Sequence, residues 1–263
     1  MRARCQRIAD AGCVEEEMGM LMSVVEGARW APAYPELAGK RVLVTGLSSS
    51  CGVDVARAFA DHKVRLILQF DEMSDETQAI AEIAAPVALD IRAFGPVTPE
   101  AREVAQFARN VMQAFGGLDA VINLVSLAPA GVGTATSLDE IERRVAERLL
   151  LPCLIAKIAA NRMALSYIEG LILNVAMLTP PLNGPARAFA CVAKTALTAM
   201  TRVLAQEWSD KAIRFNAITP ETADPRAQPR LAGEPEVAEL ALYLASGRGQ
   251  AFSGQVFEAE ATW

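Results

Sequence analysis

The sequence has a single histidine, His62, and only three tyrosines among its 263 residues. Its cysteines are scattered and form no Cys-x-x-Cys pair: Cys5, Cys13, Cys51, Cys153 and Cys191. A zinc site needs clustered thiolate, imidazole or carboxylate ligands, so no metal site is predicted. An odd number of scattered cysteines favours free thiols in a reducing compartment over a disulfide framework.

Long basic runs and long apolar runs are also missing. The net charge is −6, which argues against nucleic acid and anionic membranes as partners, because both need clustered lysine and arginine. No apolar stretch reaches the ~20 residues that span a bilayer. Met18–Val25 is apolar, but residues 15–17 before it are glutamates, where a signal peptide carries positive charge. We therefore expect a cytoplasmic protein.

The composition is that of a folded chain with a short extension. Apolar residues make up 52% and charged residues 21%, which allows a sizeable core. Residues 1–38 are predicted to be an N-terminal extension, either disordered or partly helical around residues 14–27. Met18, Met20 or Met22 could each start the chain, so residues 1–21 need not belong to the native protein. Residues 39–263 are predicted to form one domain.

From Lys40 onward, short apolar strands alternate with helical patterns. The predicted strands are Arg41–Thr45, Val64–Phe70, Pro86–Leu89, Leu118–Val125, Leu171–Val175, Ile213–Ile218 and Gln255–Glu258. The predicted helices are Val53–Asp61, Pro99–Phe115, Leu138–Leu165 with a kink at Pro152, Ala186–Trp208 and Pro235–Ala245. Such alternation predicts an α/β fold, a parallel sheet covered on both faces, with ligands at the carboxyl ends of the strands.

The first strand leads into a turn rich in glycine and serine, and a helix follows. Gly46 can make the tight turn, and Gly52 permits close packing of helix on strand. Ser48 and Ser49 could hydrogen-bond a phosphate at the helix N-terminus, where backbone N–H groups attract anions. The same residues would equally suit a plain turn in which serines cap the helix.

Further motifs along the chain support the nucleotide interpretation. Each of the following segments matches, in whole or in part, the motif given after it: Thr45–Gly52 (T-G-x-x-x-G-x-G), Asp90 (an acidic residue that contacts adenine), Asn123 (N-N-A-G), Asn174–Met177 (N-x-S-S), Lys194 (Y-x-x-x-K), Asn216–Pro220 (N-x-x-x-P-G) and Ser253–Val256 (T-G-Q). In this order they resemble the short-chain dehydrogenase/reductase (SDR) family over about residues 38–258. The resemblance implies a three-layer, doubly wound Rossmann-type domain. It also implies a dinucleotide held by Gly46, Ser48, Ser49, Gly52, Asp71, Asp90, Asn123 and Lys194.

Several positions depart from that pattern around the expected cofactor. Ser50 replaces the middle glycine of the first motif, and a side chain there intrudes where backbone should meet cofactor. Leu124 and Val125 add bulk beside the adenosine site, and Glu221 replaces the glycine of the P-G pair. An acidic side chain there would repel pyrophosphate.

The end of the second strand bears on the choice of nucleotide. Phe70 stands where NAD-using members carry aspartate, and Asp71 follows it. A carboxylate could bind a ribose diol and would repel a 2′-phosphate, so NAD is favoured over NADP if any nucleotide binds. A solvated acidic turn is an equally good interpretation of Asp71 and Glu72.

The catalytic group departs furthest from the family. There a tyrosine transfers the proton, a lysine lowers its pKa, a serine orients the substrate and an asparagine supports a proton relay. In this sequence Ala190 falls on the tyrosine position, Met177 on the serine position and Arg148 on the asparagine position. Only Lys194 is retained, and it could simply be a helix lysine paired with an acid. Tyr34, Tyr167 and Tyr243 are not expected near the pocket.

Two long helices, 138–165 and 186–208, correspond to those that form dimer interfaces in the family. Leucines and isoleucine crowd the first of them, although they could face only their own sheet: Leu149, Leu150, Leu151, Leu154 and Ile155. A homo-oligomer, or a hetero-oligomer with an active SDR subunit, is therefore expected.

Two functions remain open from the sequence. The first is a catalytically inactive SDR protein that works as a binding or structural subunit. The second is an active NAD(P)-dependent oxidoreductase acting on ketones, alcohols or 3-oxoacyl groups, in which Thr179, Lys194 and a water replace the tyrosine. A cofactor-free dehalogenase is disfavoured, since those relatives keep the serine and the tyrosine.

Overall fold

The sheet and its helices are taken from a computed structural model that describes residues 33–49, 51–126, 139, 143, 145–177, 184–220 and 234–259. Within these ranges seven parallel strands form one sheet in the order β3-β2-β1-β4-β5-β6-β7. The strands are β1 (Arg41–Leu47), β2 (Arg65–Phe70), β3 (Asp90–Phe94), β4 (Ala120–Ser126), β5 (Gly170–Met177), β6 (Ile213–Pro220) and β7 (Val256–Ala259). The predicted α/β fold with a doubly wound parallel sheet is thus confirmed.

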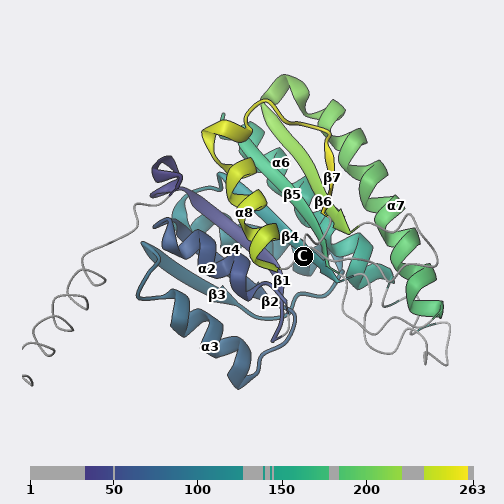
Figure 1. The fold of residues 1–263 in the computed structure, drawn as a ribbon, viewed down its shortest axis with the longest axis horizontal. Coiled ribbons are helices and arrows are strands. Elements are labelled where there is room, and N and C mark those ends of the chain that lie inside the picture. The colour runs from purple at the N-terminus through teal and green to yellow at the C-terminus, as the bar shows by residue number, and fades with distance from the viewer. Residues whose placement is uncertain are drawn as a thin grey trace, which may run out of the picture. The chain divides into compact units, whose positions relative to one another are not determined.

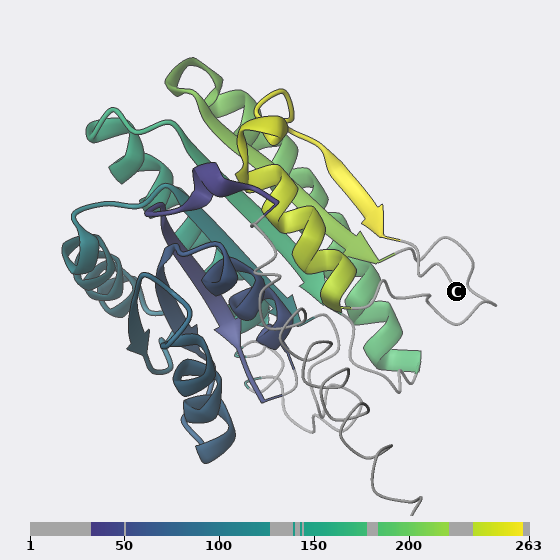
Figure 2. The ribbon, with the colours of Figure 1, turned by 60° about the vertical axis from the view of Figure 1, so that its left-hand side comes forward.

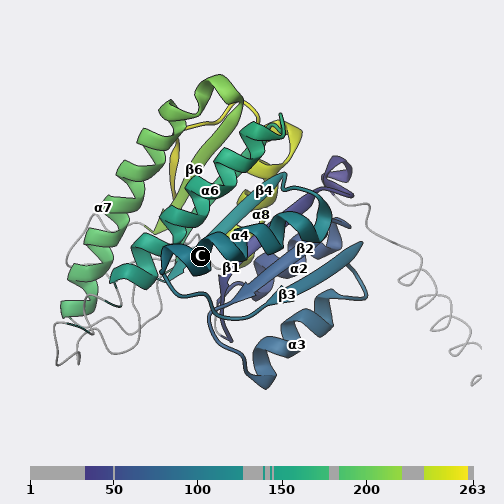
Figure 3. The same cartoon turned by 180° about the vertical axis from the view of Figure 1, so that it is seen from behind.

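Helices cover both faces of the sheet. They are α2 (Val53–Asp61), α3 (Asp75–Ala84), α4 (Ala101–Phe115), α6 (Leu151–Leu165), α7 (Gly184–Glu207) and α8 (Glu234–Ala245). One core joins the sheet to α2, α3 and α8, which lie in front in Figure 1. A second core joins it to α4, α6 and α7, as the view from behind in Figure 3 shows. None of the described helices is long and apolar enough to cross a bilayer.

All strands point the same way, so their carboxyl ends share one edge and their amino ends the other (Figure 2). The chain winds outward in both directions from β1, which lies between β2 and β4. The switch in strand order falls between β1 and β4, where ligands bind in sheets of this kind. The short helical turn Pro35–Leu37 lies just before β1, and Leu37 is buried in the core.

Two elements on the β3 side differ from the prediction. The third strand runs over Asp90–Phe94, after the apolar stretch Pro86–Leu89. It is an edge strand with partly exposed side chains, so apolar content does not mark it. Helix α3 was not predicted; Ser74 caps it, accepting from the Thr77 N–H at 3.3 Å.

The helix predicted over 138–165 changes character before Pro152. A π-helical turn spans Ala146–Leu150, and α6 begins directly after it. Proline lacks an N–H group and cannot close a normal helical turn with the residues before it. The wider π-helical turn accommodates the proline, and Arg148 lies in this turn.

A chain of buried polar side chains links the central strands to α7. The Thr45 hydroxyl donates to the Asn123 side chain at 2.9 Å, which donates to Asn174 at 3.0 Å. Asn174 in turn donates to Thr201 on α7 at 3.3 Å. All four residues are buried, so these bonds, together with one from the Asn123 side chain to the Pro152 carbonyl at 3.5 Å, replace bonds to water.

Replacing Asn123 with alanine should therefore lower the free energy of unfolding by about 2–4 kcal/mol, because it leaves Thr45 and Asn174 with unsatisfied buried groups. Urea denaturation measures the change. Asn110→Ala is the matched control, since the Asn110 side chain bonds Gln106 on the exposed face of α4, and its effect should stay within about 0.5 kcal/mol. Equal effects of the two substitutions would contradict a structural role for the buried chain.

Candidate active site

The carboxyl edge of the sheet brings together most of the predicted residues. Gly46 is the last residue but one of β1, β4 carries Asn123 and β5 ends at Met177. Gly46 has a φ of +76°, and a Cβ there would lie 2.1 Å from the Leu124 carbonyl oxygen. Only glycine fits, because the β1 turn passes directly against β4.

The loop after Gly46 closes on itself. The Ser48 N–H donates to the Cys51 carbonyl at 3.0 Å, and the Cys51 N–H donates back at 3.3 Å. The Gly46 N–H donates to the side-chain oxygen of buried Gln69 at 2.9 Å, and the Ser49 hydroxyl reaches Glu72 at 3.4 Å. These backbone and hydroxyl groups, predicted to face a phosphate, are thus bonded within the chain. Ser50 lies outside the described residues.

The N-terminus of α2 already holds an anion, the carboxylate of Glu234 from the first turn of α8. The Asp54 N–H donates to Glu234 Oε1 at 2.8 Å. Burial raises the pKa of Glu234, although backbone hydrogen bonds from Asp54, Val55 and Gly52 oppose that rise. Helix N-termini attract anions through unsatisfied N–H groups and the helix dipole. Glu234 therefore occupies the place where a dinucleotide pyrophosphate was expected.

Leu124 closes the crevice from the β4 side. A Cβ added to Gly52 would lie 2.3 Å from Leu124 Cδ1, so this leucine packs directly on the glycine. Gly52 itself has a φ of +94° and precedes α2. The bulk predicted for Leu124 is thus placed against the phosphate loop.

Asp71 and Arg148 form an ion pair over the same crevice. The Arg148 guanidinium donates to the Asp71 carboxylate at 2.7 Å, and about a quarter of each side chain is exposed. The sequence left Asp71 open between a ribose contact and a solvated acidic turn, and it placed Arg148 on the asparagine position of the catalytic group. In the structure the two neutralise one another, and the cavity beneath them measures only about 20 Å³.

Asp90 is not brought to this site. It begins β3, opposite Arg65 at the start of β2, and so lies at the amino edge. Its carboxylate accepts from Arg92 at 2.6 Å and from the Ile91 N–H at 2.8 Å. Phe94 takes its place at the carboxyl end, because the strand starts later than the apolar pattern indicates.

Lys194 lies on α7, one turn after Ala190, and pairs with Glu258 of β7 at 3.1 Å. Only 13% of the lysine side chain is exposed. The ammonium group of Lys194 is therefore paired with a carboxylate in the structure. The position of Ala190 in α7 is described but its side chain is not, and Thr179 and Glu221 lie outside the described residues.

The three tyrosines lie elsewhere. Tyr34 stacks on His62 with ring centroids 5.8 Å apart, and Tyr243 contacts the Phe252 ring. Tyr167 is 96% exposed in the connection before β5. All three lie toward the amino edge, so none can serve Lys194.

Among the three cysteines that the structure describes, Cys51 lies beside the crevice. Burial raises its pKa to about 12, and the charges of Glu234 and Asp71 act in the same direction. The thiol therefore stays protonated at neutral pH and is a poor nucleophile. Across the described ranges, no group of three His, Cys, Asp or Glu side chains could hold a metal ion.

The sequence is similar to a known protein family over most of its length. A family model described as "Enoyl-(Acyl carrier protein) reductase" matches residues 46–236. The chain belongs to the SDR family. An "Uncharacterized oxidoreductase" of Thermotoga maritima is 30% identical over 205 residues, covering 77% of this chain and 79% of that protein. The L-fucose dehydrogenase of Mus musculus is 30% identical over 239 residues, covering 81% and 85%.

Solved structures agree in fold. A short chain dehydrogenase from Mycobacterium smegmatis superposes with a TM-score of 0.72 at 20% identity, covering 89% of this chain and 96% of that one. One from Burkholderia cenocepacia, in complex with NADP, gives 0.69 at 20% identity, covering 85% and 97%. The SDR family is one of NAD(P)-dependent oxidoreductases, and none of these comparisons shows that activity has been lost here.

The described crevice does not fit a dinucleotide without rearrangement. Glu234 holds the amides of α2, Leu124 fills the space over Gly52, and the Asp71–Arg148 pair covers what remains. The sequence did not single out Glu234 or Gln69. Glu234 lies 180 residues from its partner Asp54, a separation at which no local pattern reveals a contact.

Proposed function

We propose that this SDR protein is a non-catalytic member of its family and works as a binding or structural subunit of an oligomer. The observation that carries the proposal is the crevice at the carboxyl edge, which the chain's own side chains close. Two further features support it. Ala190 and Met177 stand at the positions of the proton donor and the orienting serine, and neither can transfer a proton.

An active NAD(P)-dependent oxidoreductase is the second candidate, and the relatives favour it. The mouse relative is named L-fucose dehydrogenase and a Bacillus subtilis relative glucose 1-dehydrogenase 2. In this candidate Thr179, Lys194 and a water replace the tyrosine. NAD is the proposed nucleotide, because the Asp71 carboxylate, once released from Arg148, would repel the 2′-phosphate of NADP.

Nucleotide binding and turnover separate the two candidates. Purified full-length protein is heated with millimolar NAD⁺, NADH, NADP⁺ or NADPH, since ligand binding raises apparent stability by mass action. NAD(P)H formation and consumption are then followed with sugars, secondary alcohols, ketones and 3-oxoacyl thioesters. The proposal expects no turnover. Turnover that is lost in Thr179→Val would establish the second candidate.

Self-association is part of the proposal, and the outer face of α7 supports it. Val192 and Val203 are 62% and 63% exposed on this helix, with small residues between them on the same face. Apolar groups on a long helix are stabilised when a partner helix covers them. The partner would be a second copy or a related active SDR subunit.

The double variant V192E/V203E should therefore turn an oligomer into monomers, because burying two carboxylates in an apolar contact is costly. Light scattering after size-exclusion chromatography measures the molar mass. Ile83→Glu is the matched control, as Ile83 is 59% exposed on α3, across the sheet from α7. A monomeric unaltered protein, or an oligomer that survives both glutamates, would contradict the α7 interface.

A further inference from the structure

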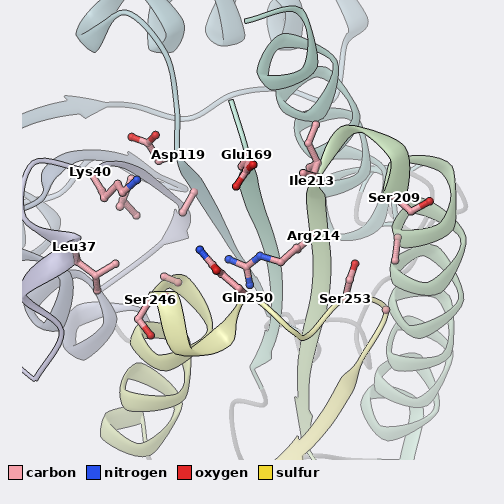
Figure 4. Close-up of a pocket in the computed structure, with 18 of the residues that line it drawn as sticks. Leu37, Lys40, Asp119, Glu169, Ser209, Ile213, Arg214, Ser246, Gln250 and Ser253 are labelled. Carbon is pink, nitrogen blue, oxygen red and sulfur yellow. The ribbon is translucent and has the colours of Figure 1, made fainter. Parts of the chain in front are cut away.

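A large cavity lies at the amino edge of the sheet, opposite the crevice described above (Figure 4). Its volume is about 1080 Å³, slightly above the range typical of small-molecule sites, roughly 300–1,000 Å³. Residues at the start of four neighbouring strands form its floor: Val42, Ala120, Gly170 and Ile213. The end of α7, the end of α8 and residues 250–254 form its walls. None of the residues assigned to the nucleotide crevice lines it.

Arg214 projects from β6 across this cavity toward Gln250, as Figure 4 shows. Its Nη1 donates to the carbonyl oxygens of Leu244 at 2.9 Å and Gly249 at 2.7 Å. These two bonds fix the guanidinium and leave its other nitrogens without a partner in the described chain. Burial lowers the pKa of Arg214, and the charge of Glu169 partly opposes that effect. The group still carries a full positive charge at neutral pH.

No described carboxylate pairs with Arg214, although three acidic residues line the cavity. Both Asp119 oxygens are bound by Arg41, at 2.8 and 2.9 Å. Glu36 accepts from the Gly247 N–H at 3.3 Å. Glu169 influences Arg214 through space and forms no ion pair with it. A half-buried guanidinium whose neighbouring acids are engaged or distant favours an added anion.

The remaining lining suits an amphipathic molecule. Lys40 and Arg202 are exposed at the rim and add positive charge there. Ala212 and Ala245 give the wall exposed apolar surface, beside polar side chains such as Gln206, Ser209 and Gln250. Ligand sites typically combine such apolar walls with a few polar groups that fix orientation.

We propose that this cavity binds a small organic anion that carries one carboxylate or one phosphate. The charged end lies on the free edge of the Arg214 guanidinium, and the apolar body lies against Ala212 and Ala245. The site is independent of the nucleotide crevice, so it stands whether or not the protein is catalytic.

Calorimetric titration of the full-length protein with octanoate, octyl phosphate and 1-octanol tests the proposal. Octanoate or octyl phosphate should bind at least tenfold more tightly than the alcohol, and the better of the two identifies the head group. Arg214→Lys should weaken binding because it keeps the charge but loses the planar fork. Octanol binding as tightly as both anions would overturn the proposal.

A second variant covers the case in which Arg214 is needed for folding. Gln250→Trp fills the cavity beside Arg214 and changes a side chain that is exposed. It should abolish octanoate binding, while Gln78→Trp on the exposed face of α3 leaves it unchanged. Millimolar NAD⁺ should not compete with octanoate. Unaltered binding in Gln250→Trp, or competition by NAD⁺, would place the anion elsewhere and overturn the proposal.

Discussion

The Glu234→Ala variant is expected to bind NAD⁺ about 20- to 700-fold more tightly than the unaltered protein. Glu234 holds the α2 amides with a charged hydrogen bond of 2.8 Å to Asp54 N–H, and a pyrophosphate must displace it. Hydrogen bonds to charged groups contribute about 1.5–3 kcal/mol and helix-dipole interactions about 0.3–1 kcal/mol, while each 1.4 kcal/mol is tenfold in affinity. Calorimetric titration with NAD⁺ measures the change.

A glutamine at position 234 separates charge from volume. If repulsion between carboxylate and phosphate keeps the nucleotide out, Glu234→Gln should recover most of the gain; if bulk does, only alanine should. Glu239→Gln is the matched control, because Glu239 is exposed on the same helix. Equal NAD⁺ affinity in all four proteins would mean that Glu234 does not compete with the nucleotide.

The same glutamate gives a pH dependence of stability. Its pKa is raised in the folded protein above the value of about 4.3 for a free glutamate. The folded state then keeps the proton to higher pH, so this contribution to stability is complete below about pH 4 and is lost as pH rises through the raised pKa. Urea denaturation from pH 4 to 8 should show the unaltered protein losing stability relative to Glu234→Gln.

The second large effect concerns catalysis. Placing tyrosine at 190 and serine at 177 in the Glu234→Ala protein should raise carbonyl reduction by about 100- to 10,000-fold, the range that a positioned proton donor contributes. The tyrosine would lie one turn before Lys194 on α7, the spacing of the family's Y-x-x-x-K motif. NADH oxidation with a panel of ketones measures the rate.

Phenylalanine at 190 is the matched control, since it has the size of tyrosine without the hydroxyl. It should leave the rate at background in the same protein. Activity in the tyrosine variant but not in the phenylalanine variant would support the view that the unaltered protein is inactive because it lacks a proton donor. A rate that does not rise, in a variant shown to bind NADH, would mean that the register of positions 177 and 190 is wrong or that another group acts.

The strands of the central sheet follow directly from the sequence, because a strand buried on both faces is a short and mainly apolar run. β2, β4 and β5 are such runs, interrupted by the buried polar residues Gln69, Asn123 and Asn174, and each was predicted within one or two residues. The edge strand β3 was misplaced, since none of its residues is fully buried and the polar residue Asp90 starts it. Helix α3 depends on a cap at Ser74 that an apolar pattern does not reveal.

The crevice was predicted less completely than the sheet. Its glycines and Asn123 could be recognised because local constraints restrict the residue type there. Examples are the positive φ of Gly46 and the close contact between β1 and β4. The Glu234 contact and the Asp71–Arg148 pair join distant segments. Which acid meets which base depends on the finished fold, so residue types alone did not give these partners.

The hydrogen bond between Glu234 and α2 can form only late in the synthesis of the chain. Helix α2 is made early, but the carboxylate that satisfies its first amides comes 180 residues later. Long-range closure of this kind slows folding, because the intervening chain must be ordered first. On the ribosome, a chain ending before α8 would thus expose the start of α2 and the core surface that α8 covers, as a ready target for chaperones.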